Sequence, residues 1–206
     1  MRTSAADEVY SEVRRVLRDG LPPGTPLREQ DFAAALNRSR ASVREAFVRA
    51  RAEGLLATQP NRGVAVPERS PELLEQLWTC LGGLEEILVA RLAALATDLS
   101  DLEDAVNAQH DLSFHHALGG LLSHEPVGVL HALVLARLEQ DEDSFTEHLV
   151  DADAFHVAHR QIVEAVQAST GERAAQLTGE HIQELIAASL WEHPKEFYGV
   201  DGRDPS

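Results

Sequence analysis

The chain has 206 residues, which allows one or two domains, and a formal net charge of −16. The charge is unevenly distributed. Residues 1–67 hold 11 arginines and 8 acidic residues, a net charge of +3, whereas residues 68–206 carry −19. A segment at −19 is repelled by phosphate, so only the N-terminal third can face a nucleic acid. The sequence therefore predicts two domains, residues 1–67 and residues 68–206, with different partners.

The single cysteine, Cys80, excludes an intramolecular disulfide and fits a reducing compartment, and we expect it to be a small core residue. The sequence has no apolar run of about 18 residues and no signal-peptide pattern, which argues against a membrane partner. Together these features predict a cytoplasmic protein.

Two short amphipathic helices are predicted at the start of the chain. Val9, Val13 and Leu17 recur at helical spacing, and the glycines and prolines of residues 20–24 end that helix. Apolar residues within 32–36 indicate a second, shorter helix.

A third helix is predicted between Ser39, a good N-cap, and Gly54, a C-terminal glycine. Its apolar stripe is Val43, Ala46, Phe47 and Ala50. Arg40, Arg44 and Arg51 lie together beside that stripe. A guanidinium group matches guanine O6/N7 or a phosphate, and two of these arginines occupy the first turns, where a recognition helix meets base edges. The pattern predicts a DNA-reading helix.

Two short β-prone runs, residues 56–59 and 64–66, follow this helix and flank the turn residues 60–63. Such a pair predicts a two-stranded wing with a basic tip at Arg62. Three helices followed by a wing form a winged helix-turn-helix.

The spacing of residues 7–67 resembles the DNA-binding domain of GntR-family regulators. The residues that carry the resemblance are Pro23-Gly24, Leu27, Glu29, Phe32-Ala33, Leu36, Ser39-Arg40, Val43-Arg44-Glu45-Ala46, Glu53-Gly54-Leu55, Pro60, Arg62-Gly63 and Val66. The resemblance implies that Arg40 and Arg44 contact the major groove or phosphates, that Ser39 and Ser42 contact the DNA backbone, and that Arg62 and Gly63 enter the minor groove. Gln30 departs from the family pattern, because some members have an arginine there.

The acidic half is predicted to be an antiparallel all-α helical bundle, so the fold class is mainly α. Ser70 and Pro71 begin a long helix that keeps a leucine stripe despite Gly82 and Gly83, where we expect a kink or a close approach of a neighbouring element. The stripe is Leu73, Leu77, Leu81, Leu84, Leu88, Leu92 and Leu95. The helices are expected at about 70–96, 100–123, 126–142, 151–168 and 172–192.

Asp111, His115, His159 and His181 fall on apolar faces of three of these helices. Burying an unpaired carboxylate is costly, so polar groups on three apolar faces suggest a common partner. Three imidazoles and one carboxylate suit a divalent ion such as Zn²⁺, Ni²⁺ or Mn²⁺. Most of the other histidines do not share a face with the apolar residues of their helices, so we expect them on the surface, with His156 as the reserve metal ligand. These histidines are His110, His116, His124, His131, His148, His156 and His193.

The acidic half also resembles the FCD effector domain of the FadR subfamily. The matching pattern is Asp111-x-x-Phe114-His115, Ser123-x-x-Pro126, His159-x-x-Ile162-x-x-Ala165, Ala174-Ala175 and His181-Ile182. The resemblance implies that Asp111, His115, His159 and His181 bind a metal beneath a small-molecule pocket. Leu81 replaces an arginine that relatives have before Glu85, and the segment between Glu85 and Asp111 is about one helix shorter than in the family.

These features predict a DNA-binding transcriptional repressor that binds a palindromic operator as a homodimer and responds to a small carboxylate metabolite at the metal site. One alternative is a direct metal sensor without an organic effector. Another is a metal-dependent enzyme, since an open position on a buried metal lowers the pKa of bound water. We do not expect an enzyme, because no additional buried general base is evident and the DNA-binding domain would have no purpose.

Overall fold

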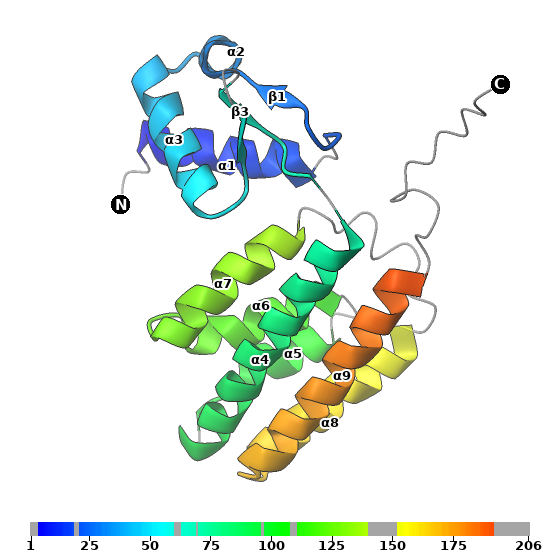
Figure 1. Cartoon of the computed structure of the whole chain (residues 1–206). Helices are drawn as coiled ribbons and strands as arrows, with labels where there is room; N and C mark the ends of the chain where they lie inside the picture. Colours follow the sequence, from blue (N-terminus) through cyan, green and yellow to red (C-terminus); the bar gives the residue numbers. More distant parts are fainter. Residues whose placement is uncertain are drawn as a thin grey trace, which may run out of the picture. The chain divides into compact units, whose positions relative to one another are not determined.

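The computed structural model describes residues 4–18, 21–59, 63–68, 70–95, 97–107, 111–139 and 152–191. The chain divides into two compact units, Met1–Arg69 with Ala136–Thr146 and Ser70–Leu135 with Glu147–Ser206. The fold is mainly α-helical, with one small sheet (Figure 1). None of the described helices combines the length and apolarity that a membrane crossing requires.

The first unit contains three helices and a three-stranded antiparallel sheet. The helices are α1 (Ala5–Arg18), α2 (Glu29–Ala35) and α3 (Arg40–Ala52), and the strands are β1 (Pro26–Leu27), β2 (Ala57–Gln59) and β3 (Gly63–Ala65). The strand order is β1-β3-β2, so β1 adds a strand that the sequence did not indicate. Residues 60–62, the predicted wing tip, lie outside the described residues. The predicted winged helix-turn-helix is confirmed.

Both predicted ends of α3 are confirmed. The Ser39 hydroxyl accepts a hydrogen bond from the Ser42 backbone N–H at 3.1 Å, as an N-cap does. At the other end Gly54 adopts a φ of +74°, and the Leu55 N–H bonds the Ala50 carbonyl at 2.8 Å. This pairing is the Schellman motif, which favours glycine because of its positive φ.

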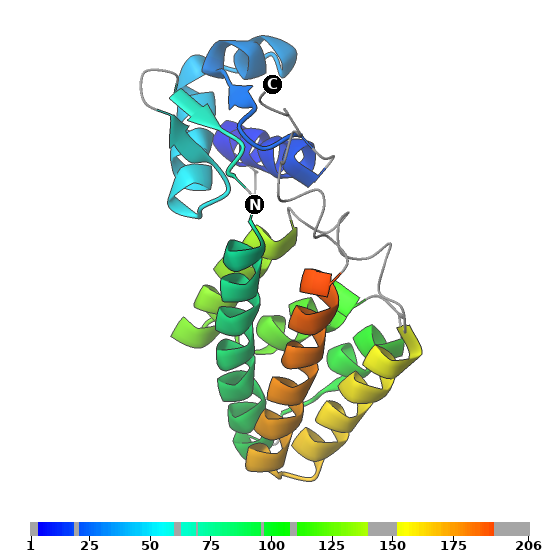
Figure 2. The same cartoon turned by 45° about the vertical axis from the view of Figure 1, so that its right-hand side comes forward.

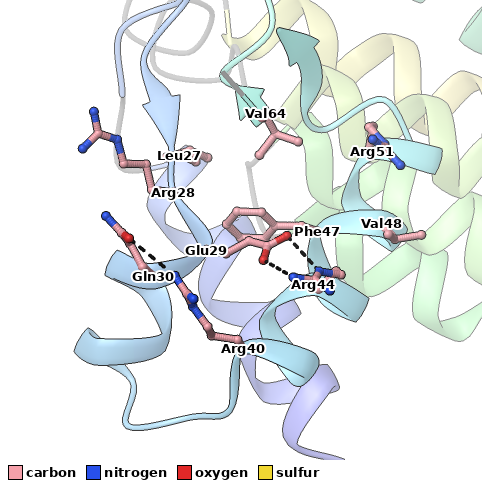
Figure 3. A pocket seen from close by; sticks show the side chains of 11 residues that line it. Leu27, Arg28, Glu29, Gln30, Arg40, Arg44, Phe47, Val48, Arg51 and Val64 are labelled. Atoms are coloured by element: carbon pink, nitrogen blue, oxygen red, sulfur yellow. Dashed lines mark hydrogen bonds and ion pairs between the residues drawn. The ribbon is translucent and has the colours of Figure 1, made fainter. Parts of the chain in front are cut away.

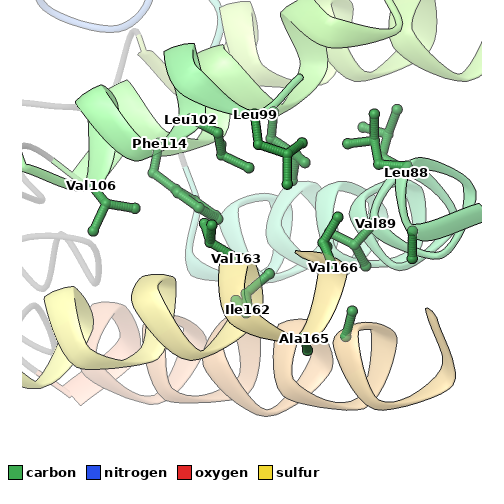
Figure 4. Packing of buried hydrophobic residues seen from close by; sticks show 14 of the residues in the cluster. Leu88, Val89, Leu99, Leu102, Val106, Phe114, Ile162, Val163, Ala165 and Val166 are labelled. Carbon is green, nitrogen blue, oxygen red and sulfur yellow. The ribbon is translucent and has the colours of Figure 1, made fainter. Parts of the chain in front are cut away.

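The second unit is a helical bundle. Its helices are α4 (Pro71–Leu95), α5 (Ser100–Asn107), α6 (Asp111–Leu121), α7 (Pro126–Leu138), α8 (Ala152–Gln167) and α9 (Gly171–Trp191). Helix α9 packs against both α4 and α8 and runs antiparallel to them, so α4 and α8 run in the same direction (Figure 2). The predicted single helix over 100–123 is wrong, because α5 and α6 are separate helices that pack against each other. They jointly fill the core, with Leu102 and Val106 of α5 in the same cluster as Phe114 of α6 (Figure 4).

The buried face of α4 is rotated relative to the predicted leucine stripe. Its buried side chains are Leu74, Trp78, Leu81, Glu85, Leu88, Val89, Leu92 and Ala93. Leu95, predicted to be in the stripe, is 51% exposed, and Cys80, predicted to be a core residue, is exposed. Both predictions were wrong, because Trp78 and Leu81 occupy the inward positions around Cys80. The helix continues through Gly82, where an added Cβ would lie 2.9 Å from the Ile182 side chain of α9. The expected close approach therefore occurs at Gly82.

Candidate DNA-binding surface and metal centre

Helices α2 and α3 and strand β3 line an open concave surface (Figure 3). Arg40, Arg44 and Arg51 project from α3 into it, while Val43 and Phe47 of the same helix are buried in the core. The three arginines that helical spacing grouped together therefore lie on the exposed face of α3.

Two side chains at the start of α2 hold the arginines of this surface in place. The Glu29 carboxylate accepts hydrogen bonds from Arg44 at 3.1 and 3.3 Å, and the Gln30 side-chain oxygen lies 3.4 Å from a terminal nitrogen of Arg40 (Figure 3). The hydrogen bonds and charge of Glu29 raise the pKa of Arg44 above its ordinary value. The Arg44 side chain is 67% exposed, and an exposed ion pair is weak enough to exchange for a stronger anionic partner.

The remaining predicted DNA contacts are only partly described. Ser39 and Ser42 stand at the exposed N-terminal end of α3, and their hydroxyl oxygens lie 2.9 Å apart. Gly63, the first residue of β3, has a φ of +88°. Arg62 lies outside the described residues.

Three histidines from three helices converge inside the bundle. His115 of α6, His159 of α8 and His181 of α9 are at most 4% exposed, and each offers a ring nitrogen within 4.8 Å of the others. Nε2 of His159 lies 2.8 Å from Nε2 of His181. Two imidazole nitrogens that face each other this closely need a proton or a cation between their lone pairs. A divalent metal that takes imidazole ligands at about 2.0–2.1 Å fits this donor set.

Aromatic rings surround the three histidines. The Phe114 ring stacks on His159 with centroids 3.9 Å apart, Trp78 lies 5.8 Å from His115, and Phe155 lies 5.5 Å from His181. Such apolar walls limit the access of water, which strengthens electrostatic interactions inside the cluster.

Asp111, the predicted carboxylate ligand, is the first residue of α6, one turn before His115. Its side chain lies outside the described part of the chain.

Glu85 of α4 is a buried carboxylate that the sequence reasoning missed. It is 0% exposed, and its Oε1 accepts hydrogen bonds from Nδ1 of His115 at 2.7 Å and Nε2 of His131 at 2.9 Å. Burial alone would raise the pKa of Glu85, but the electrostatic interactions and hydrogen bonds with His115 and His131 outweigh it and lower the pKa to about 2. The sequence did contain a signal for the burial of Glu85, because it lies one turn after Leu81 and one turn before Leu88, both in the apolar stripe.

His131, predicted to be a surface residue, is 1% exposed, so that prediction was wrong. Residues 126–136 of α7 contain no charged side chain, so the sequence does not show which face of this helix is exposed. The position of His131 could therefore not be assigned from the pattern of polar and apolar residues. Gly119 of α6 provides the space, since an added Cβ would lie 2.2 Å from Nδ1 of His131.

His116, His124 and His156, the remaining described histidines, lie outside the cluster. His116 and His124 are exposed, as predicted, and His156 is half-buried with its Nε2 2.9 Å from Arg160. His110, His148 and His193 lie outside the described residues.

Two family models match the chain. Residues 5–66 match the model described as bacterial regulatory proteins, gntR family, and residues 73–184 match the FCD domain model. Together they cover both the helix-turn-helix unit and the helices that carry the histidine cluster.

Curated relatives are named as regulators. The HTH-type transcriptional repressor RspR of Escherichia coli is 23% identical over 195 residues, which cover 86% of each chain. An uncharacterized HTH-type transcriptional regulator of Agrobacterium vitis is 33% identical over 95 residues, 46% of this chain and 54% of that relative.

Solved structures agree with the fold. A GntR transcriptional regulator from Rhodococcus sp. RHA1 superimposes with a TM-score of 0.75 at 26% identity, covering 91% of this chain and 98% of that one. Escherichia coli McbR/YncC superimposes with a TM-score of 0.69 at 21% identity, covering 91% and 98%.

Proposed function

Since the chain belongs to the GntR family of bacterial regulatory proteins and carries an FCD domain, we propose that it is a metal-containing repressor controlled by a small-molecule effector. The family matches and the names of the relatives identify a transcriptional regulator and not an enzyme. The observation that carries the finer proposal is the convergence of His115, His159 and His181 within one buried cluster. The relative RspR, which is named a repressor, supports the sign of regulation.

In this proposal α3 is the recognition helix. Arg40 and Arg44 contact bases or phosphates in the major groove, and Ser39 and Ser42 contact the DNA backbone. Arg62 and Gly63 reach the minor groove at the wing tip. Support comes from the exposed placement of Arg40 and Arg44 on one concave surface, in a unit with an excess of arginine over acidic residues.

Asp111, His115, His159 and His181 would hold the divalent ion, which is Zn²⁺, Ni²⁺ or Mn²⁺. When bound, the ion supplies an open coordination position that a carboxylate metabolite can occupy. The residues come from α6, α8 and α9, so they would link α6 to two consecutive helices later in the chain. Effector binding would change the relative population of two dimer conformations with different operator affinities.

A test of the effector proposal uses an operator selected from a random DNA pool and a panel of small mono-, di- and tricarboxylates. We expect at least one carboxylate to lower operator affinity for the metal-loaded protein and to have no effect after chelation. If the metal alone changes operator affinity and no carboxylate does, the chain is a direct metal sensor. If neither changes it, the effector proposal fails.

The homodimer has a candidate contact surface on α7. This helix is apolar on both sides, and it exposes Val129, Leu130 and Leu133 at 50%, 53% and 37%. A helix that is apolar all round is normally buried. We propose that the partner is a second copy of the chain. Residues 68–206 carry a net charge of −19, so two copies of this domain repel each other except where an uncharged surface lies between them. Ile87 of α4 is 55% exposed and lies one turn before Arg91, which pairs with Glu125 at the start of α7. This pair places the exposed face of α4 beside α7, so Ile87 extends the apolar surface.

Light scattering should report about 45 kDa for the wild type, twice the 22.5 kDa of one chain. Leu130→Glu should shift the mass to that of a monomer, because it places a charge in an apolar two-fold contact. Val157→Glu on α8 is a matched control, since Val157 is 51% exposed outside the proposed surface, and it should remain dimeric. A monomeric wild type at micromolar concentration, or a dimeric Leu130→Glu, would contradict the assignment.

A further inference from the structure

Glu85 is the one buried carboxylate on α4 among the described residues, and it is not among the proposed metal ligands. We propose that Glu85 is the positioning residue of the centre. It holds His115 so that Nε2 faces His159 and His181, and His131 holds Glu85 in place from α7. This inference rests on the proposed metal centre and assigns roles to two residues outside it.

The first step concerns the two nitrogens of His115. Nδ1 lies 2.7 Å from Oε1 of Glu85, and an ionised carboxylate only accepts hydrogen bonds, so Nδ1 carries the proton. A neutral imidazole has one ring proton, and Nε2 is then the nitrogen with the lone pair. A metal ligand needs that lone pair. The Glu85 contact therefore selects the tautomer of His115 that can bind an ion through Nε2.

The second step concerns the orientation of the ring. The His115 ring lies 5.5 Å from the His159 ring and 5.6 Å from the His181 ring, measured between centroids. With Nδ1 fixed on α4, the opposite edge of the ring is directed to the side where the other two histidines meet. Metal-ligating histidines commonly donate their second N–H to a carboxylate in this way, and loss of that partner typically weakens metal binding about 10- to 100-fold.

The third step concerns His131. Its Nε2 lies 2.9 Å from the same Oε1 of Glu85, so one oxygen accepts from α6 and α7 at once. Two donors restrict the carboxylate more than one donor would. Gly119 allows this arrangement, because any side chain there would displace the His131 ring. His131 thus acts on the centre only through Glu85, without contributing a ligand to the proposed set.

The test compares Glu85→Gln with Glu75→Gln. Glutamine keeps the size of Glu85 and removes its charge, and Glu75→Gln makes the same chemical change at an exposed position of the same helix. Zn²⁺ affinity is measured by competition with a chromophoric chelator, and folding by circular dichroism. We expect Glu85→Gln to bind Zn²⁺ about 10- to 100-fold more weakly and Glu75→Gln to match the wild type. His131→Leu should give a smaller loss than Glu85→Gln.

A second measurement needs no variant and separates positioning from a purely structural role. Two-dimensional ¹H–¹⁵N spectra of the metal-free wild type report which ring nitrogen of His115 carries the proton. We expect Nδ1–H, and a proton on Nε2 would overturn the inference. A folded Glu85→Gln with unchanged Zn²⁺ affinity would also overturn it. A wild type that binds no Zn²⁺, Ni²⁺ or Mn²⁺ would instead remove the proposed metal centre itself.

Discussion

Replacing Arg44 with alanine is expected to weaken operator binding by about 1–3 kcal/mol, or about 5- to 150-fold. Arg44 projects from α3 into the concave surface shared with Arg40 and Arg51, and its guanidinium is 67% exposed. Its hydrogen bonds to Glu29 already restrict the guanidinium, so less ordering is required when a DNA acceptor replaces that carboxylate. Fluorescence anisotropy with the selected operator measures the change.

Arg15→Ala is the matched control for Arg44→Ala. It removes the same charge from α1, where Arg15 pairs with Glu12 on an exposed face. The control should retain most of the operator affinity, and both variants should keep wild-type helicity and dimer mass. An Arg44→Ala variant with wild-type operator affinity would remove α3 from its assigned role.

The second large effect concerns His181. In the wild type, chelation should lower the melting temperature by about 5–10 °C, because a ligand held about 100-fold above its Kd contributes about 2.7 kcal/mol to the folded state. His181→Ala should lose most of that response. His181 is the ligand that α9 supplies to the proposed set, so its removal would release α9 from the ion that links it to α6 and α8.

His124→Ala is the control for this second prediction, since His124 is exposed between α6 and α7. It should respond to chelation as the wild type does. If His181→Ala and the wild type show equal shifts on chelation and re-addition of metal, the ion binds elsewhere in the chain.

Local signals made the helix-turn-helix unit predictable from the sequence. Ser39 and Gly54 act on neighbouring backbone groups, so their effect depends on residues a few positions away. Two inward histidines, His159 and His181, were also predictable, because each shares a helix face with apolar residues at helical spacing. On both helices the sequence distinguishes a polar face from an apolar face, and this difference shows which residues are buried.

The burial of Glu85 and His131 was not predicted, for the opposite reason. On α7 nearly every residue is apolar, so periodicity does not determine which face turns inward. On α4 the leucine stripe is compatible with two rotations, and Trp78 and the contact of Gly82 with Ile182 select the one that buries Glu85. Both choices depend on packing between helices that are distant in sequence. A buried carboxylate paired with two histidines is visible only when α4, α6 and α7 are assembled.

The metal content of the protein, purified without an affinity tag, tests the central claim most directly. Elemental analysis should find about one equivalent of Zn, Ni or Mn per chain in the wild type and much less in His181→Ala, since the ion and the folded bundle stabilise each other. Less than about a tenth of an equivalent of any transition metal, with no thermal shift when Zn²⁺, Ni²⁺ or Mn²⁺ is added, would contradict it. The three histidines and Glu85 would then be a buried hydrogen-bonded network without a metal.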